Sequence, residues 1–128
     1  MDWPYLAGFF DGEGNIHFNK IANKSYQVLC RMYSSNEEVL LRIRNFLGFG
    51  NLYKKKSTGM CELTISNKEN NLLFLKSIHP YSIIKRQTIE FVLGNYDFKR
   101  GKNNLNFDIS AFHKLITRKN RERFYRDW

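Results

Sequence analysis

Hydrophobic and polar positions along this chain switch twice between helical and strand-like spacing. Residues 3–12 are apolar on every side, which predicts a short helix buried on several sides, with Pro4 in its first turn. Residues 15–21 and 26–33 alternate polar with apolar positions, as two strands joined by a turn would. The elements expected further along are a helix ending at Gly48, strands at 51–56 and 60–66, a helix ending before Pro80, a helix at 84–93 and a helical stretch at 109–126.

Two serine–glutamate spacings mark where the second and third helices are expected to begin. Ser34 and Ser35 each precede a glutamate by three residues, and Ser66 stands three residues before Glu69, which is the spacing of a capping box. The order helix, hairpin, helix, hairpin, helix, helix predicts an α+β domain with one four-stranded antiparallel sheet and helices on one face. We expect a single domain over residues 1–128, with the helix–hairpin core at 1–94 and a basic C-terminal extension at 95–128.

Charge separates the two parts of the chain and points to a polyanionic partner. The chain has 21 Lys and Arg against 12 Asp and Glu, a net charge of +9, and the first 53 residues contribute none of this excess. Because no basic amphipathic segment with a long apolar face is evident, nucleic acid is favoured over a membrane. The alternative on charge alone is a generally basic, solvated surface.

Cysteine and histidine patterns give no sign of a zinc site or a disulfide framework. Cys30 and Cys61 fall in expected strands without a CxxC spacing, so we expect reduced core cysteines. The three histidines are scattered, no apolar run approaches the length of a membrane span, and the N-terminus does not resemble a signal peptide.

Residues 6–14, with the sequence LAGFFDGEG, form the most informative segment. Small residues on an otherwise bulky helix permit a second helix to approach closely. Asp11 and Glu13 stand at the C-terminal end of that helix, where the dipole is already negative, so a cation would make this grouping favourable. The alternative interpretation is that both acids only form a turn around the glycines.

This segment resembles the LAGLIDADG motif of homing endonucleases, with matches at Leu6, Ala7, Gly8, Asp11 and Gly14 and with Glu13 in place of the penultimate acid. The expected order of elements is that of the family, so the resemblance covers most of the chain and implies its fold, with a saddle-shaped sheet. Only one copy of the motif is present. The resemblance therefore implies a homodimer in which the motif helices pack together, through Leu6, Ala7, Gly8 and Phe10.

The resemblance also implies a metal-dependent nuclease site. Its metal ligands would be Glu13 and the carbonyl of Gly12, with Mg²⁺ as the cofactor, Mn²⁺ as a substitute and Ca²⁺ supporting binding only. Lys85 is the best match to a basic residue that would polarise metal-bound water or stabilise charge on the phosphate, so Glu13 and Lys85 are the catalytic candidates. Many family members place a water-holding Gln at the end of the second strand, where this chain offers Met32 and Ser34 instead.

A family-like interface would read DNA with the polar side of the sheet. The outward residues expected there are Asn15, His17, Asn19, Gln27, Arg31, Tyr53, Lys55, Glu62 and Thr64. Phosphate contacts are expected from Lys54, Lys56, Lys99, Arg100, Lys102 and the basic stretch at 118–123.

The function expected from these residues is cleavage of a long, roughly palindromic intron or intein insertion site in double-stranded DNA. Three alternatives stay open: an RNA-binding maturase that assists splicing of its own intron, a DNA-binding regulator that does not cleave, and a structural nucleoid-binding module. The last would not need so polar a sheet face. An acid at Glu13 argues against the regulator, because DNA binding alone gains nothing from a carboxylate near phosphates. The expected location is the cytoplasm of a prokaryote, near the nucleoid, or an organellar matrix.

Overall fold

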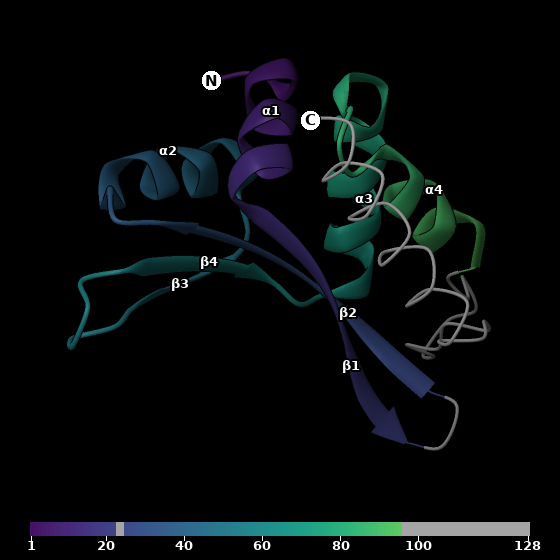
Figure 1. Cartoon of the computed structure of the whole chain (residues 1–128), viewed down its shortest axis with the longest axis horizontal. Helices are drawn as coiled ribbons and strands as arrows, with labels where there is room; N and C mark the ends of the chain where they lie inside the picture. The colour runs from purple at the N-terminus through teal and green to yellow at the C-terminus, as the bar shows by residue number, and fades with distance from the viewer. Residues whose placement is uncertain (23–24, 96–128) are drawn as a thin grey trace, which may run out of the picture.

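A computed structural model of the chain describes residues 1–22 and 25–95 and confirms the α+β fold. Four helices and a short 3₁₀ helix accompany four strands in the described part, in the expected order of two helix–hairpin blocks followed by helices (Figure 1). Their bounds are α1 Trp3–Glu13, β1 Gly14–Ala22, β2 Ser25–Ser34, α2 Glu37–Leu47, β3 Asn51–Lys54, β4 Cys61–Ile65, α3 Lys68–Ile78, η1 His79–Tyr81 and α4 Arg86–Asn95.

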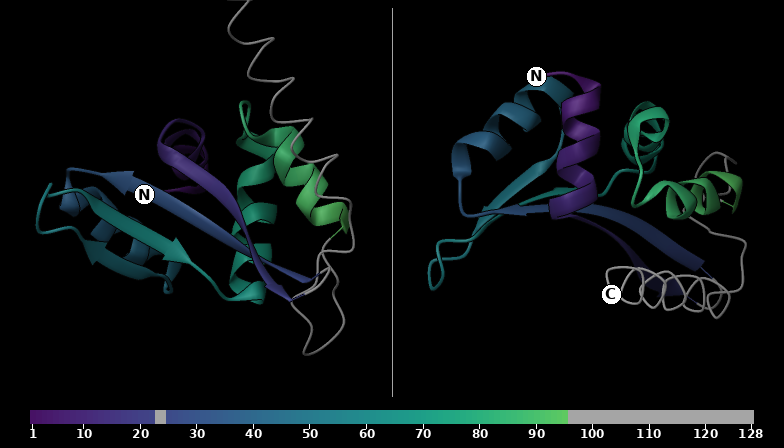
Figure 2. Two further views of the ribbon diagram at one scale, coloured as in Figure 1. Left: turned by 60° about the horizontal axis from the view of Figure 1, so that its bottom comes forward. Right: turned by 45° about the horizontal axis from the view of Figure 1, so that its top comes forward.

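The strands form one antiparallel sheet in the order β1-β2-β4-β3. Figures 1 and 2 show α1, α2, α3 and α4 on the same side of this sheet. On the other side, which we call the open face, no helix of the described residues covers the strands. A curved sheet covered on one side only is what the alternating pattern of the hairpins predicts.

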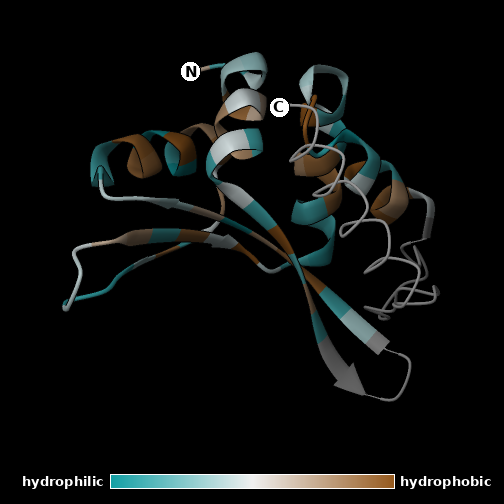
Figure 3. Cartoon of the chain, viewed as in Figure 1, coloured by the Kyte–Doolittle hydropathy of each residue, from teal (hydrophilic) through white to brown (hydrophobic). Residues whose placement is uncertain are grey.

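Cross-strand pairing assigns each residue to one of the two faces, because directly opposed residues point the same way. Ile16 pairs with Cys30 and Leu52 with Leu63 on the side of the helices. The buried side chains there join those of the helices in one core, and Figure 3 shows hydrophobic positions recurring along the strands and helices that form it. The core residues on the strands include Ile16, Val28, Cys30, Met32, Cys61, Leu63 and Ile65.

Helix α1 is buried on one side only within this chain. Leu6, Ala7 and Phe10 have no exposed surface, and the Phe10 ring packs edge-on against Phe74 of α3 with 5.0 Å between ring centroids. Tyr5 is half exposed, and Gly8 lies on the surface. The expectation that this apolar helix is buried on several sides is therefore wrong for the single chain.

Asparagine, not serine, caps the second and third helices. The side chain of Asn36 accepts a hydrogen bond from the Val39 N–H, and that of Asn67 accepts one from the Asn70 N–H. Ser34 instead accepts a hydrogen bond from the backbone N–H of Asn36. Asn and Ser are about equally good N-caps, so the glutamate spacing alone misplaced the caps by one or two residues.

The cysteines, the last described helix and the C-terminal extension were also predicted from the sequence. Both cysteines are free and buried, and burial raises the pKa of the Cys30 thiol. Helix α4 begins at Arg86 instead of 84 and runs to Asn95. In the described part of the chain, no helix has the length and apolar character needed to cross a membrane. Most of the expected extension at 95–128 lies outside the described residues.

Candidate functional site

The carboxyl end of α1 passes directly into β1, without a loop. Glu13 is the last helical residue, and Gly14 is both the helix C-cap and the first residue of the strand. The N–H of Gly14 donates to the Phe10 carbonyl, and a Cβ at Gly14 would lie 2.6 Å from that same oxygen. Only glycine fits there, so it places the exposed side chain of Glu13 at a fixed point between helix and sheet.

Asp11 is buried and is used by the protein itself. Its carboxylate accepts hydrogen bonds from the hydroxyl of Ser82 at 3.2 Å and from the backbone N–H groups of Ile83, Ile84 and Lys85 at 2.7, 3.2 and 3.2 Å. Successive backbone N–H groups of this kind form an anion-binding concavity. Asp11 therefore connects the end of α1 to the segment before α4, more than seventy residues away in the sequence.

Lys85 lies at the same end of α1. Its ammonium donates to the backbone carbonyl of Asp11 at 2.8 Å and lies 5.5 Å from the centre of the Phe10 ring. Its own backbone carbonyl accepts from the Ile89 N–H, in the first turn of α4. The two catalytic candidates, Glu13 and Lys85, thus lie at one helix end, and their catalytic roles stay a prediction.

The donor groups at this helix end suit a hard divalent cation. Glu13 and Gly12 are both exposed, so a carboxylate and a backbone carbonyl are available, while Asp11 is occupied by its four hydrogen bonds. Mg²⁺ is commonly held by one or two carboxylates together with substrate phosphates and water. Within residues 1–22 and 25–95, no cluster of three His, Cys, Asp or Glu side chains could hold a metal alone. The residues present fit a metal site that phosphate completes.

The open face carries nearly all the polar residues predicted to face outward. Asn15 pairs with Arg31, Asn19 with Gln27, and Tyr53 with Glu62. Arg31 also pairs with Thr64, which places β1, β2, β4 and β3 in one continuous polar surface. His17 lies on the same surface opposite Leu29. Asn15, His17, Asn19, Tyr53 and Lys55 are exposed.

Three residues of this surface, Thr64, Glu62 and Gln27, are less available than expected because they are already hydrogen-bonded. Thr64 is only 8% exposed, and its hydroxyl donates to Glu62 at 3.0 Å. The side-chain amide of Gln27 donates to the Ser66 carbonyl at 3.0 Å, so a bidentate contact with adenine would require that bond to break. Local alternation places Thr64 and Glu62 side by side on β4, but it does not reveal the Gln27 bond, because Ser66 is 39 residues away in the sequence.

Arg31 differs from its neighbours. Its Nε is buried and has no hydrogen-bond partner among the described residues. Buried polar groups of folded proteins are nearly always paired, so an unpaired one in the middle of an open surface is a candidate for pairing with a ligand.

Among the expected phosphate contacts, only the lysines near β3 can be located. The ammonium of Lys54 lies 3.5 Å from the Glu37 carboxylate, because Lys54 pairs with Cys61 and so belongs to the helix-covered side. Lys55 and Lys56 are exposed. Lys99, Arg100, Lys102 and the stretch at 118–123 lie outside the described residues.

The expected dimer contacts are mostly interior. Leu6, Ala7 and Phe10 have no exposed side-chain surface, so they have nothing to offer a second chain, and the prediction for them is corrected. Gly8 is exposed, and no atom of the described residues lies within 4 Å of a Cβ placed on it or on Gly12. The side of α1 that a second helix could approach is therefore formed by Pro4, Tyr5, Gly8 and Gly12.

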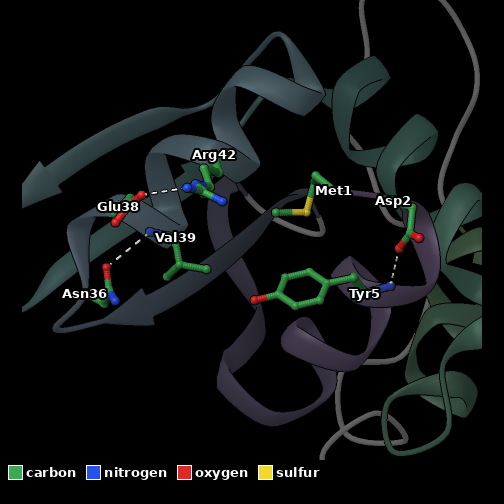
Figure 4. Close-up of a pocket in the computed structure, with 7 residues that line it drawn as sticks. All are labelled: Met1, Asp2, Tyr5, Asn36, Glu38, Val39 and Arg42. Atoms are coloured by element: carbon green, nitrogen blue, oxygen red, sulfur yellow. Dashed lines mark hydrogen bonds and ion pairs between the residues drawn. The ribbon is translucent and has the colours of Figure 1, made fainter.

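A pocket of about 490 Å³ lies at the other end of α1. Figure 4 shows Tyr5 between the first turns of α1 and α2, with Asp2 bonded to the Tyr5 N–H and Arg42 bonded to Glu38. The residues that line it are Met1, Asp2, Tyr5, Asn36, Glu38, Val39 and Arg42. None of the predicted catalytic or DNA-binding residues is among them.

Sequence reasoning missed two groups of residues. Leu29, Tyr33 and Asn51 belong to the open face by their register, and the same alternation that identified Arg31 and Tyr53 could have identified them. Ser82 and Ile83, which hold Asp11, gave no local signal, because their partner is distant in the sequence.

Comparisons with known proteins agree with this geometry. The chain matches the sequence profile of the LAGLIDADG endonucleases over residues 6–96. Among solved structures it is similar to the homing endonuclease I-CvuI in complex with its target in the presence of 2 mM Ca, with a TM-score of 0.64 and 26% identity over 72% of this chain. It is also similar in fold to the archaeal intron-encoded homing endonuclease I-Vdi141I complexed with DNA, with a TM-score of 0.60 and 20% identity over 70% of this chain.

A second structure of I-CvuI, with the I-CreI target in the presence of 2 mM Mg, contains DNA that is not cleaved; its TM-score is 0.63 and its identity 25% over 72% of this chain. The matched regions cover 63% of the I-CvuI chain and 62% of the I-Vdi141I chain. No curated protein matches the sequence.

Proposed function

Because the chain belongs to the family of LAGLIDADG endonucleases, we propose that it is a site-specific double-strand DNA endonuclease that acts as a homodimer with divalent metal. The observation that carries the proposal is the position of Glu13. This exposed carboxylate ends α1 and is followed within two residues by Asn15, the first polar residue of the open face. The acid and the surface proposed to read DNA are therefore joined by the backbone.

The open face is suited to a duplex in both shape and chemistry. A curved antiparallel sheet can enter the major groove, where amide, guanidinium and hydroxyl groups distinguish base pairs by their hydrogen-bonding edges. Asn15, Asn19, Arg31 and Tyr53 supply such groups, and the net charge of +9 favours a polyanion. I-CvuI and I-Vdi141I are themselves solved with DNA, which supports this assignment.

The metal is proposed to be Mg²⁺ at Glu13 and the Gly12 carbonyl, where it would stabilise charge on the attacking and leaving oxygens of a phosphodiester. Lys85 would hold a positive charge beside this site, since its ammonium is already fixed at the end of α1. Two chains would bring two such sites together through the exposed side of α1, with Gly8 and Gly12 permitting close approach of the helices.

Glu13→Gln tests the function directly, because it keeps the size of the side chain and removes its charge. We expect single-turnover cleavage of the insertion-site DNA in Mg²⁺ to fall by about three orders of magnitude or more, with binding in Ca²⁺ retained or tightened. Glu38→Gln is the matched control, since Glu38 is an exposed acid of α2 paired with Arg42. Its cleavage rate should equal that of the wild type.

The alternatives give different results in the same assay. Near-normal cutting by Glu13→Gln would refute the metal assignment. Binding of the DNA by the wild type without cutting in Mg²⁺ would favour a regulator, and preference for the intron RNA over the DNA would favour a maturase.

A further inference from the structure

Asp11 contacts both the backbone and the side chain of Lys85. Its carboxylate accepts a hydrogen bond from the Lys85 backbone N–H at 3.2 Å, and its backbone carbonyl accepts one from the Lys85 ammonium at 2.8 Å. A lysine side chain normally has many rotamers, and fixing it has an entropic cost. The two hydrogen bonds to Asp11 fix both the backbone of Lys85 and the ammonium at the tip of its side chain.

The remaining bonds of Asp11 hold the segment that carries Lys85. The hydroxyl of Ser82 and the N–H groups of Ile83 and Ile84 all donate to the Asp11 carboxylate. Ile83 is 83% exposed and Ile84 is 41% exposed, so little apolar packing holds this segment in place. Its position therefore rests on hydrogen bonds, those to Asp11 together with those of the Ser82 N–H to the carbonyls of Ile78 and His79.

Capping of α1 does not explain why a buried carboxylate, that of Asp11, lies at the C-terminal end of this helix. A carboxylate at the carboxyl end of α1 is unfavourable for that helix, whereas three N–H groups from another segment compensate a buried negative charge. Asp2 shows the contrast, since it caps the first turn of the same helix by accepting from the Tyr5 N–H at 2.9 Å.

From these contacts we infer that Asp11 is a positioning residue, which fixes the ammonium of Lys85 at the metal-binding end of α1. The inference rests on the proposed function, in which Lys85 supplies positive charge beside Glu13. Asp11 itself touches neither metal nor DNA. Its effect on cleavage passes through Lys85.

A double-mutant cycle separates positioning from a merely structural role. Single-turnover cleavage in Mg²⁺ is measured for the wild type, Asp11→Asn, Lys85→Met and the double variant, on a duplex selected for cleavage by the wild type from a random library. We expect Lys85→Met to slow cleavage by about 100-fold or more and Asp11→Asn by about 10- to 100-fold. In the Lys85→Met background, Asp11→Asn should then slow cleavage by less than about twofold, because the two residues act as one unit.

Asp2→Asn is the matched control: the same substitution at the other end of the same helix. It keeps a capping oxygen and removes a charge that the helix dipole favours, so it should lower the melting temperature slightly without changing the cleavage rate below that temperature. If Asp11→Asn does not fold, Asp11→Ser replaces it in the cycle, since a hydroxyl can still accept one of the hydrogen bonds.

The results of the cycle distinguish failure of the positioning role from failure of the proposed function. Independent, multiplying effects of Asp11→Asn and Lys85→Met would overturn the positioning role and leave the proposed function intact. Normal cleavage by Lys85→Met would overturn the role of Lys85, and the inference with it. A wild type that cleaves no DNA in the library would overturn both the proposed function and the inference.

Discussion

Arg31 and Thr64 oppose each other on strands β2 and β4 of the open face, and the Nε of Arg31 is buried there without a hydrogen-bond partner in the described part of the chain. The Nε–H of Arg31 needs an acceptor, and the Thr64 hydroxyl, which donates its hydrogen to Glu62, does not accept from it. An unpaired buried donor costs about 1–3 kcal/mol. In the proposed function, DNA supplies the missing partner.

Because the Arg31 donor is unpaired among the described residues, we expect a substitution of Arg31 to affect folding stability and DNA affinity in opposite directions. Arg31→Met removes the unpaired donor and keeps an unbranched side chain, so the melting temperature should stay the same or rise. Affinity for the selected duplex should fall by about 1–3 kcal/mol, with relaxed base preference at one position in each half-site. Thermal unfolding and binding by the variant test both statements, and an unchanged base preference would contradict the second.

Gly8 provides a test of the dimer that leaves the fold alone. A side chain at Gly8 meets no atom within 4 Å, so Gly8→Leu should fold at least as well as the wild type, since glycine disfavours a helix by about 0.5–1 kcal/mol. The dimer should weaken about tenfold or more, equivalent to about 1.4 kcal/mol. Sedimentation over a range of concentrations measures this.

The control for this experiment is Gly94→Leu, at a glycine of α4 whose added Cβ would also meet no atom of residues 1–22 and 25–95 within 4 Å. It should leave the dimer unchanged. A wild type that sediments as a monomer at micromolar concentration would count against the proposed assembly, and a Gly8→Leu protein that dimerises normally would place the contact elsewhere.

Gly14 is expected to be the least replaceable glycine of the motif. Any Cβ there approaches the Phe10 carbonyl oxygen to 2.6 Å, so Gly14→Ala must displace the helix end or the start of β1. We expect a loss of about 1–3 kcal/mol in the free energy of unfolding, the usual effect of overpacking. Chemical denaturation measures it, and Gly94→Ala, with open space around it, should not be destabilised.

One surface contact makes stability depend on pH. His79 Nε2 lies 2.9 Å from the Glu90 carboxylate, and this hydrogen bond, with Arg86 nearby, holds the pKa of Glu90 below its ordinary value of 4.5. The folded chain thus binds this proton less readily than the unfolded chain. The stabilisation of the folded chain by ionised Glu90 is complete above pH 4.5. It disappears as the pH falls through the pKa of Glu90 in the folded state.

Glu90→Gln should therefore lower the melting temperature slightly at pH 5–6, by an amount that shrinks as the pH falls below 4.5. The effect is small, because the Glu90 side chain is about half exposed. Melting curves of both proteins across this range test it, and a difference that persists unchanged at the acid end would contradict the assignment.

The sequence predicts the sheet and its two faces because alternation is a local property. Asn15, Arg31 and Tyr53 lie on the open face as expected, and Ile16 and Cys30 lie on the covered one. The helices were also predictable, but their first residues were not, since Asn36 and Asn67 compete with neighbouring serines as caps.

Long-range contacts are what the sequence could not supply. An all-apolar helix does not reveal which side meets its own core, so Leu6, Ala7 and Phe10 were assigned to a partner that they cannot reach. Asp11 was grouped with Glu13 at the end of α1 or in a turn, whereas its partners come from residues 82–85.

The absence of a loop between α1 and β1 has a consequence for how targets could change. Glu13 and Asn15 are separated only by Gly14, so in the proposed function covalent geometry would set the offset between the bond to be cut and the first base pair read. Substitutions along the open face could then alter which bases are preferred while the cutting position stays constant. New target sequences would be accessible by point mutation, without the chemistry having to be realigned each time.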